Sequence, residues 1–372
     1  MNAPRALTIF AAALLLSAPL SSCGGVRRGS ARERPARVIL LIGDGVGAAY
    51  WTAARFTAPP LQVERFTTMG LVDTRSTSSW ITDSAAGGTA YSTGVRTYNG
   101  AIGVGPDSVP VPNVLQAVRA RGWATGIVST SSVTHATPAS FVAHVPSRSQ
   151  EFDIAKDIVA SGVDVFLGGG VSWFDGKVRP DSTDFLARVR STHTLVTSAA
   201  ELAAVDLAST PRLAGLFAEN GMPAAAERTP TLPDMTRAAL EVLARDRDGF
   251  FLMVEGSQPD WLGHDHAPIG DVAREVLDFD AAVGAALDFA DAHPGTLVVV
   301  VADHETGGMA IELTPDSLHV EGTPRVPFAD YATTGHTGQM TPLFAAGPGA
   351  HLFGGVKDNF RVGQILMSLV TR

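Results

Sequence analysis

A serine in an unusual setting is the first candidate for chemistry in this chain. Ser84 lies in the segment TDSAAGGTAYSTG, where it follows an acid and precedes two alanines and two glycines. A serine nucleophile needs a group that removes its proton or stabilises its alkoxide. The segment from Trp80 to Gly94 contains no histidine or lysine that could act as a base. Activation must therefore come from elsewhere in the chain or from a bound metal ion.

The same segment also fits a purely structural role. Asp and Ser are common helix caps, and a "TDS" before small residues could be a cap without chemistry. The run after Ser84 has helix-forming character and ends at Gly94. We expect Ser84 at a helix N-terminus, where free N–H groups and the helix dipole favour an anion.

Acids and histidines that could bind metal ions recur in four short motifs. They are Asp44 in GDGVG, Glu255, Asp260, His264 and His266 in VEGSQPDWLGHDH, Asp303 and His304 in ADHETGG, and His336 in TTGHTG. Each residue alone has an ordinary reading as a turn, cap or structural histidine. Together, so many acids at one place would be costly without cations. Imidazole plus carboxylate suits zinc, whereas carboxylate and hydroxyl oxygens suit magnesium.

These motifs follow apolar runs that are typical of buried strands. The runs cover residues 37–43, 125–130, 163–169, 249–256 and 295–303, and they are continuous rather than alternating. Helix-like segments lie between them, near residues 47–57, 111–121, 150–161, 234–246 and 270–292. The pattern predicts an α/β fold with a large, mostly parallel central sheet and helices on both faces. We expect residues 171–233, which are less regular, to form a peripheral insert.

The predicted sheet would bring the motifs together, because ligands of such sheets bind beyond the carboxyl ends of the strands. The segment THATPASFVAHVPSR follows another of these strands and adds two candidates. Thr137 offers a hydroxyl ligand. Arg148 offers a planar guanidinium that can hold two oxygens of a phosphate. A multi-ion site beside one oxygen nucleophile indicates phosphoryl transfer.

The N-terminus has the features of an export signal. Arg5 precedes an apolar run and small residues, which predicts a signal peptide over residues 1–22. Cys23, the only cysteine, ends the lipobox-like sequence LSSC, so we expect a lipid-anchored tether over residues 23–36 and one domain over residues 37–372. These features predict that the protein is secreted and is a periplasmic or cell-surface lipoprotein. A net charge of −9 argues against nucleic acid as a partner.

The chain resembles the alkaline phosphatase family. The motifs that carry the resemblance are LIGDGVG, TDSAAGGTAYSTGVRTYNGAIGV, HATPASFVAHVPSR, VEGSQPDWLGHDH, VVVADHETGG and TTGHTG, in the order of the family. They span residues 38 to 338. The combination is highly specific, although any one motif alone would not be.

The resemblance implies a role for each residue and two Zn²⁺ and one Mg²⁺ per chain. Ser84 becomes the nucleophile that is phosphorylated, and Arg148 binds the phosphate. Asp260, His264 and His336 hold the first zinc, whereas Asp44, Asp303 and His304 hold the second. Asp44, Thr137 and Glu255 hold the magnesium. We assign no ligand role to His144 or His266. The resemblance is also compatible with a homodimer.

Two residues depart from the best-known bacterial pattern of the family. His135 stands where that pattern has an aspartate near the magnesium, and Trp261 stands where it has a lysine. Similar replacements occur elsewhere in the family. They put in doubt which metal the third site prefers, not the activity itself.

The sequence therefore predicts a metal-dependent phosphomonoester hydrolase that acts on small molecules through a phosphoserine. A phosphodiesterase of the same superfamily is one alternative, but a diesterase has less use for the Arg148 clamp. A sulfatase is another, but Ser84 lacks the C/S-x-P-x-R setting. A non-catalytic phosphate-binding lipoprotein is the third, and it would not need both Ser84 and a full set of metal ligands.

Overall fold

The central feature of the molecule is a ten-stranded sheet. The computed structural model describes Met1, residues 34–314 and residues 326–371. The strand order is β14-β2-β13-β8-β1-β7-β3-β4-β6-β5. The strands are β1 (Arg37–Gly43), β2 (Thr68–Asp73), β3 (Ala124–Ser132), β4 (Val165–Gly169), β5 (Thr194–Val196), β6 (Leu213–Leu216), β7 (Phe250–Gly256), β8 (Thr296–Val301), β13 (Thr341–Ala346) and β14 (Gly355–Asp358).

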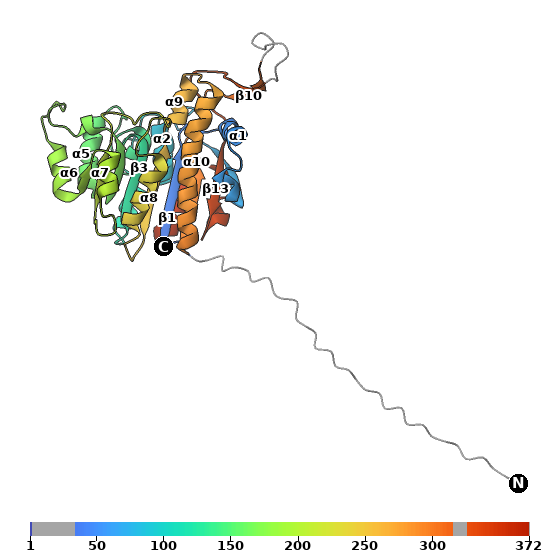
Figure 1. Ribbon diagram of the computed structural model, residues 1–372, viewed down its shortest axis with the longest axis horizontal. Helices are drawn as coiled ribbons and strands as arrows, with labels where there is room; N and C mark the ends of the chain where they lie inside the picture. Colours follow the sequence, from blue (N-terminus) through green and yellow to red (C-terminus); the bar gives the residue numbers. More distant parts are fainter. Residues whose placement is uncertain (2–33, 315–325, 372) are drawn as a thin grey trace. The chain divides into compact units, whose positions relative to one another are not determined.

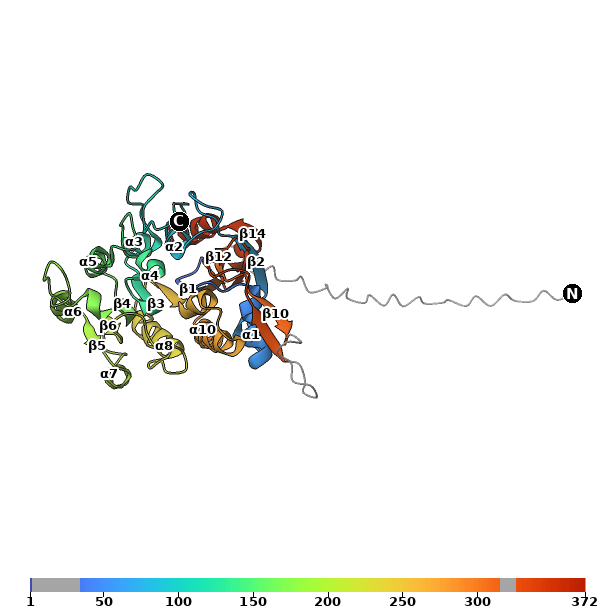
Figure 2. The ribbon, with the colours of Figure 1, turned by 90° about the horizontal axis from the view of Figure 1, so that it is seen from above.

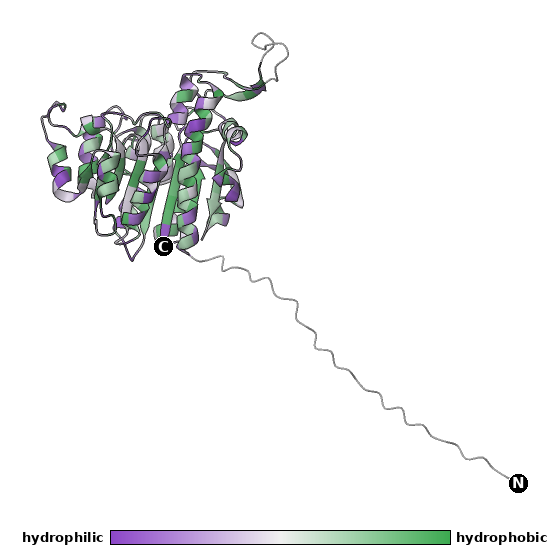
Figure 3. Ribbon diagram, viewed as in Figure 1, coloured by the Kyte–Doolittle hydropathy of each residue, from purple (hydrophilic) through white to green (hydrophobic). Residues whose placement is uncertain are grey.

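The sheet is mostly parallel, which confirms the predicted fold class. Among the described strands of this sheet, β13 alone runs opposite to its neighbours, β2 and β8. The middle strands β1, β7 and β8 are almost wholly buried, so apolar side chains are needed on both faces. This explains why they read as continuous apolar runs in the sequence, and Figure 3 shows the hydrophobic colouring along them.

Helices cover both faces of the sheet (Figures 1 and 2). One face carries α1 (Ala48–Thr57), α8 (Leu232–Leu243) and α10 (Ile269–Ala292), which pack on one another. The other face carries α2 (Ser84–Thr93), α3 (Val114–Arg119), α5 (Glu151–Ser161) and α11 (Asn359–Thr371). Each layer has its own core of buried side chains, one on each side of the sheet. The five predicted helices are present, with ends shifted by up to three residues.

The segment 171–233 is more than a peripheral insert. It contains α6 (Phe185–Thr192) and α7 (Ala199–Ala204), but also β5 and β6, which extend the main sheet. Strand β6 pairs in parallel with β4, beginning with Leu213 opposite Val165. These two strands leave little signal in the sequence, because β5 and β6 are only three and four residues long.

Two predictions about the N-terminus concern residues outside the described part of the chain. The predicted signal peptide falls in the segment 2–33, and so does Cys23. In the part of the chain that the structure describes, no helix combines the length and apolar character needed to cross a bilayer.

Parallel pairing brings the predicted site residues to one edge. Gly43 at the end of β1 lies opposite Gly256 at the end of β7, so Asp44, one residue after this pair, and Glu255, one residue before it, lie at the same end of the sheet. The backbone N–H of Asp44 donates to the carbonyl of Gly256 (3.0 Å). The helix α9 (Gln258–His264) follows β7 at this edge, near the top of Figure 1.

Candidate active site

Ser84 is the first residue of α2. The preceding residue, Asp83, caps this helix by accepting a hydrogen bond from the N–H of Ala86 (3.0 Å). The helix ends at Gly94, which has a φ of 72°. Because this left-handed conformation suits glycine, the helix ends where the sequence predicted. Ser84 is buried, and its position at the helix N-terminus is as expected.

The small residues after Ser84 let α2 approach the other motifs closely. A Cβ atom added at Gly87 would lie 3.0 Å from the Cβ of Asp303 and 3.1 Å from its carbonyl oxygen. Any side chain there would push the helix away from the strand end that carries Asp303. The glycine therefore sets the distance between Ser84 and the acids at the end of β8.

The structure brings the predicted metal ligands into three groups. In each group, one ligand atom per residue lies within 4.8 Å of those of the other members. The groups are Asp260 with His304 and His336, Asp44 with Asp303 and His304, and Asp44 with His135 and Glu255. Five motifs far apart in the sequence thus meet at one edge of the sheet.

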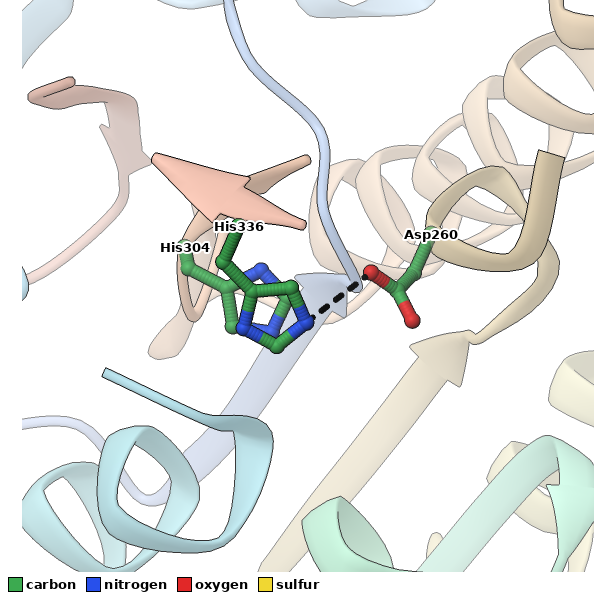
Figure 4. A group of neighbouring side chains, drawn as sticks. All are labelled: Asp260, His304 and His336. Carbon is green, nitrogen blue, oxygen red and sulfur yellow. Dashed lines mark ion pairs between the residues drawn. The ribbon is translucent and has the colours of Figure 1, made fainter. Parts of the chain in front are cut away.

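The first group lies beside a small two-stranded sheet, which contains His336 and directly follows His304. Strands β9 (Glu305–Thr306) and β12 (His336–Thr337) pair here, with His336 opposite Thr306. The rings of His304 and His336 stack with centroids 3.5 Å apart, and the Nε2 atom of His336 lies 3.5 Å from Asp260 Oδ1 (Figure 4). His264, the third ligand predicted for this site, lies next to the group, with its Nε2 atom 3.3 Å from the same oxygen. His304, predicted for the other zinc site, belongs to both groups.

The Ser84 hydroxyl lies against the second group. Its Oγ atom is 3.2 Å from His304 Nε2. The same nitrogen is 3.3 Å from Asp44 Oδ1 and 3.4 Å from Asp303 Oδ2. Serine, imidazole and two carboxylates therefore converge on one point, which is a suitable place for a divalent cation that contacts the nucleophile.

Several buried atoms at this edge have no hydrogen-bond partner. They are both carboxylate oxygens of Asp44, Asp303 Oδ2, Glu255 Oε1, Thr137 Oγ1 and His135 Nδ1. Buried polar atoms nearly always have a hydrogen-bond partner, so a set of buried oxygens without one indicates ligands for a metal ion. Oxygen and imidazole donors without thiolate fit zinc and magnesium.

The crowding of these acids shifts their pKa values in two directions. Burial and the neighbouring Asp303 raise the pKa of Asp44, and burial raises that of Asp303 to about 6. Burial also raises the pKa of Glu255 to about 7. Asp260 differs: burial opposes ionisation, but the hydrogen bond from His264 and the charges of His304 and His336 outweigh it and lower its pKa.

Arg148 is held in place by two neighbours. Its Nη1 donates to Asp83 Oδ2 (3.2 Å), and its Nη2 lies 3.1 Å from His135 Nε2. The acid before Ser84 thus both caps α2 and orients the arginine. A half-buried guanidinium next to a helix N-terminus can bind the oxygens of a phosphate.

The two departures from the bacterial pattern lie next to each other. The rings of His135 and Trp261 meet edge to face, with centroids 6.3 Å apart. His135 precedes the short helix α4 (Ala136–Ala139), which carries Thr137. Burial, together with the nearby charge of Arg148, lowers the pKa of His135 to about 3, so the imidazole is neutral.

The histidines without a predicted ligand role have structural contacts. His266 stacks on Tyr331 with an angle of 2° between the planes, and its Nε2 atom contacts the carbonyl oxygen of Thr333 (2.9 Å). His144 contacts Gln116 and the carbonyl of Gly103. Each of these two histidines therefore has hydrogen-bond contacts outside the candidate metal groups.

The sequence reasoning missed one residue that contacts both zinc-type groups. Thr306 is buried and lies on β9, two residues after His304. Its hydroxyl contacts Asp260 and His304. The only sequence signal was a hydroxyl residue inside the motif ADHETGG, because the contact with Asp260 arises only when α9 packs against β9.

The comparisons with known proteins agree with this geometry. The sequence profile described as "Alkaline phosphatase" matches residues 36–326. Alkaline phosphatase 3 of Bacillus subtilis is 34% identical, with 95% of this chain and 94% of the relative covered. Streptomycin-6-phosphate phosphatase of Streptomyces griseus is 38% identical, with 93% and 92% covered.

Solved structures give the same result. The alkaline phosphatase from the Antarctic bacterium TAB5 superposes with a TM-score of 0.84 at 37% identity, covering 91% of this chain and 98% of that one. A mutant of the TAB5 enzyme in which a histidine is replaced by aspartate has magnesium bound in its M3 site.

Proposed function

The chain belongs to the alkaline phosphatase family and is a phosphomonoester hydrolase; from this premise, we propose that Ser84 is its nucleophile. The observation that carries this assignment is the place of the Ser84 hydroxyl. It lies at the N-terminus of α2 and 3.2 Å from His304 Nε2, beside buried carboxylate oxygens of Asp44 and Asp303 that have no hydrogen-bond partner among the described residues. No other serine, threonine or cysteine hydroxyl or thiol is in this position among the described residues.

The reaction follows from the groups around Ser84. The Ser84 oxygen attacks phosphorus, the bond from phosphorus to the leaving oxygen breaks, and the alcohol departs. Arg148 and the positive end of the α2 helix dipole stabilise the non-bridging oxygens, whose charge grows in the transition state. Water then attacks the phosphoserine from the side of the departed alcohol. Inorganic phosphate is released and the hydroxyl is restored.

The ligand sets support two zinc ions and one magnesium ion. Asp260, His264 and His336 would hold one zinc, and Asp44, Asp303 and His304 the other. Asp44, Thr137 and Glu255 would hold magnesium. When bound, these cations lower the pKa of the serine hydroxyl and neutralise charge on the attacking and leaving oxygens.

The relatives support a broad substrate range defined by the phosphate group. One of them is a streptomycin-6-phosphate phosphatase, whereas others are general alkaline phosphatases. A panel of monoesters, diesters and sulfate esters, with metal analysis of the purified enzyme, tests the assignment. We expect zinc and magnesium in the protein and hydrolysis of monoesters well above that of the other esters. Preferential diester hydrolysis would favour the phosphodiesterase alternative instead.

We also propose that Cys23 is the lipidated first residue of the mature protein. The lipobox-like sequence LSSC and the polar segment behind it support this assignment. Lipidation would place the enzyme at a membrane facing the periplasm or the outside. Mass spectrometry of the mature N-terminus tests this. Cleavage at another position with an unmodified Cys23 would contradict it.

A further inference from the structure

Thr306 links ligands of both candidate zinc sites. Its Oγ1 atom donates a hydrogen bond to Asp260 Oδ1, and it lies 3.2 Å from His304 Nδ1. Its backbone pairs with His336 in the two-stranded β9–β12 sheet. Among the described residues, one buried side chain therefore contacts ligands that come from α9 and from the end of β8, and its strand adjoins the one that carries the third ligand.

The direction of these hydrogen bonds follows from the chemistry of the groups. A carboxylate only accepts hydrogen bonds, so the single Thr306 hydroxyl proton points to Asp260. Thr306 Oγ1 must then act as acceptor towards His304 Nδ1, which therefore carries the ring proton. In the neutral imidazole the other nitrogen, Nε2, keeps its lone pair. That nitrogen faces Ser84, Asp44 and Asp303 at 3.2 to 3.4 Å.

The position of Thr306 is fixed by its surroundings. The Tyr50 hydroxyl donates to the Thr306 carbonyl oxygen (2.6 Å), and the Thr306 N–H donates to the carbonyl of Gly45 (3.2 Å). A Cβ atom at Gly45 would lie 2.7 Å from Thr306 Oγ1, and one at Gly263 would lie 2.2 Å from the Tyr50 hydroxyl. Two glycines thus leave room for this arrangement, and the threonine side chain has little freedom.

We propose that Thr306 is a positioning residue that holds His304 in the tautomer with a free Nε2 and fixes the orientation of Asp260. The hydrogen-bond chain runs from His304 Nδ1 through the Thr306 hydroxyl to Asp260 Oδ1, so it connects the two zinc sites. This inference rests on the proposed function, because it assumes that these residues bind zinc. Outer partners that orient metal ligands typically change metal affinity by 10- to 100-fold.

Two substitutions separate the hydroxyl from the shape of the side chain. Thr306→Val keeps the shape but removes donor and acceptor, whereas Thr306→Ser keeps the hydroxyl. As a matched control, Thr236→Val removes another fully buried threonine hydroxyl, which donates to the Leu232 carbonyl in α8, away from the site. The zinc content of each folded enzyme is measured at a series of buffered free zinc concentrations. We expect Thr306→Val to need about 10- to 100-fold more free zinc for half occupancy. Thr306→Ser and Thr236→Val should stay within about threefold of the natural enzyme, because each keeps the hydrogen-bond chain intact.

Nuclear magnetic resonance of the natural, zinc-loaded enzyme with ¹⁵N-labelled histidine gives an independent test that needs no variant. We expect the His304 proton on Nδ1 and the metal on Nε2, with the Nδ1 proton exchanging slowly with water. A proton on Nε2, or equal zinc affinities of the valine and serine variants, would overturn the proposal. If the enzyme still hydrolyses phosphomonoesters in either case, the proposed function stands and only the role of Thr306 falls.

Discussion

The candidate site has a histidine side and a carboxylate side, and the acids of the two sides differ in their hydrogen bonds and in the direction of their pKa shifts. On the histidine side, formed by Asp260, His264 and His336, the carboxylate lies near two imidazoles and accepts a hydrogen bond from Thr306. On the carboxylate side, formed by Asp44, Glu255 and Thr137, four oxygens have no hydrogen-bond partner. The pKa of Asp260 is accordingly lowered, whereas those of Asp44 and Glu255 are raised.

This difference shows that the two sides depend on cations to different degrees. Imidazoles and a hydroxyl satisfy Asp260 within the protein itself. The acids of the carboxylate side have few such partners, so burying their charge is costly until a cation binds. Loss of metal should therefore destabilise the carboxylate side more than the histidine side.

The largest effect should come from the residue between the two sides. Ser84→Ala removes the nucleophile but no charged ligand, so we expect kcat/KM to fall by on the order of a thousandfold or more. Zinc and magnesium contents should stay close to those of the natural enzyme. Steady-state kinetics with metal analysis measures both. Nearly full activity in the variant would contradict the assignment of the nucleophile.

The second-largest effect should come from the buried charge of Glu255, which lowers the free energy of unfolding when no cation is bound. The pKa of Glu255 rises from 4.5 to about 7 in the folded, metal-free protein. The folded state then binds more protons than the unfolded state between these values, so stability falls as pH rises through this window. Metal-free Glu255→Gln should thus be more stable than the metal-free natural enzyme at pH 8, by on the order of 3 kcal/mol.

Urea unfolding of both proteins at several pH values measures this difference. It should shrink towards pH 5, and the histidines contribute equally to both proteins. With magnesium bound, the order should reverse, because the variant lacks a charged ligand. A difference that is independent of pH would mean that the Glu255 charge is not the cause.

A smaller effect should come from Trp261, which adjoins His135. Trp261→Lys places an ammonium near the phosphate site, which adds attraction of on the order of 1 kcal/mol for a partly solvated contact. We expect inorganic phosphate to inhibit the variant about fivefold more tightly. The inhibition constant measures this, with Trp261→Phe as the control that keeps an uncharged ring. Equal constants for the lysine and phenylalanine variants would show that the ring is only a packing choice.

The smallest effect should come from His135→Asp. Aspartate would add a negative charge beside Asp44 and Glu255, which would attract a divalent cation more strongly. We expect the magnesium concentration for half-maximal activity to fall a few-fold. Magnesium activation curves, with His135→Asn as the uncharged control, measure it. An asparagine variant as sensitive to magnesium as the aspartate variant would exclude charge as the cause.

The sequence predicted most of the site because strands and ligands leave strong local signals. The buried strands β1, β7 and β8 are continuous apolar runs. Asp44 directly follows β1, Glu255 is the last residue but one of β7, and Asp303 lies two residues after β8. In contrast, β6 is four residues long, and β2 mostly alternates between half-buried and exposed residues, so neither has a comparable run. The contact of Thr306 with Asp260 could not be predicted, because it arises only when α9 packs against β9.

The central claim is that Ser84 carries the phosphate between the two half-reactions. The most direct test is to mix the enzyme with a phosphomonoester, quench in acid and analyse the peptides by mass spectrometry. The account predicts one phosphate on Ser84, in the peptide that contains DSAAGGTAYSTG, and none in Ser84→Ala. Phosphate on another residue, or turnover without any phosphorylated peptide in the quenched natural enzyme, would contradict it.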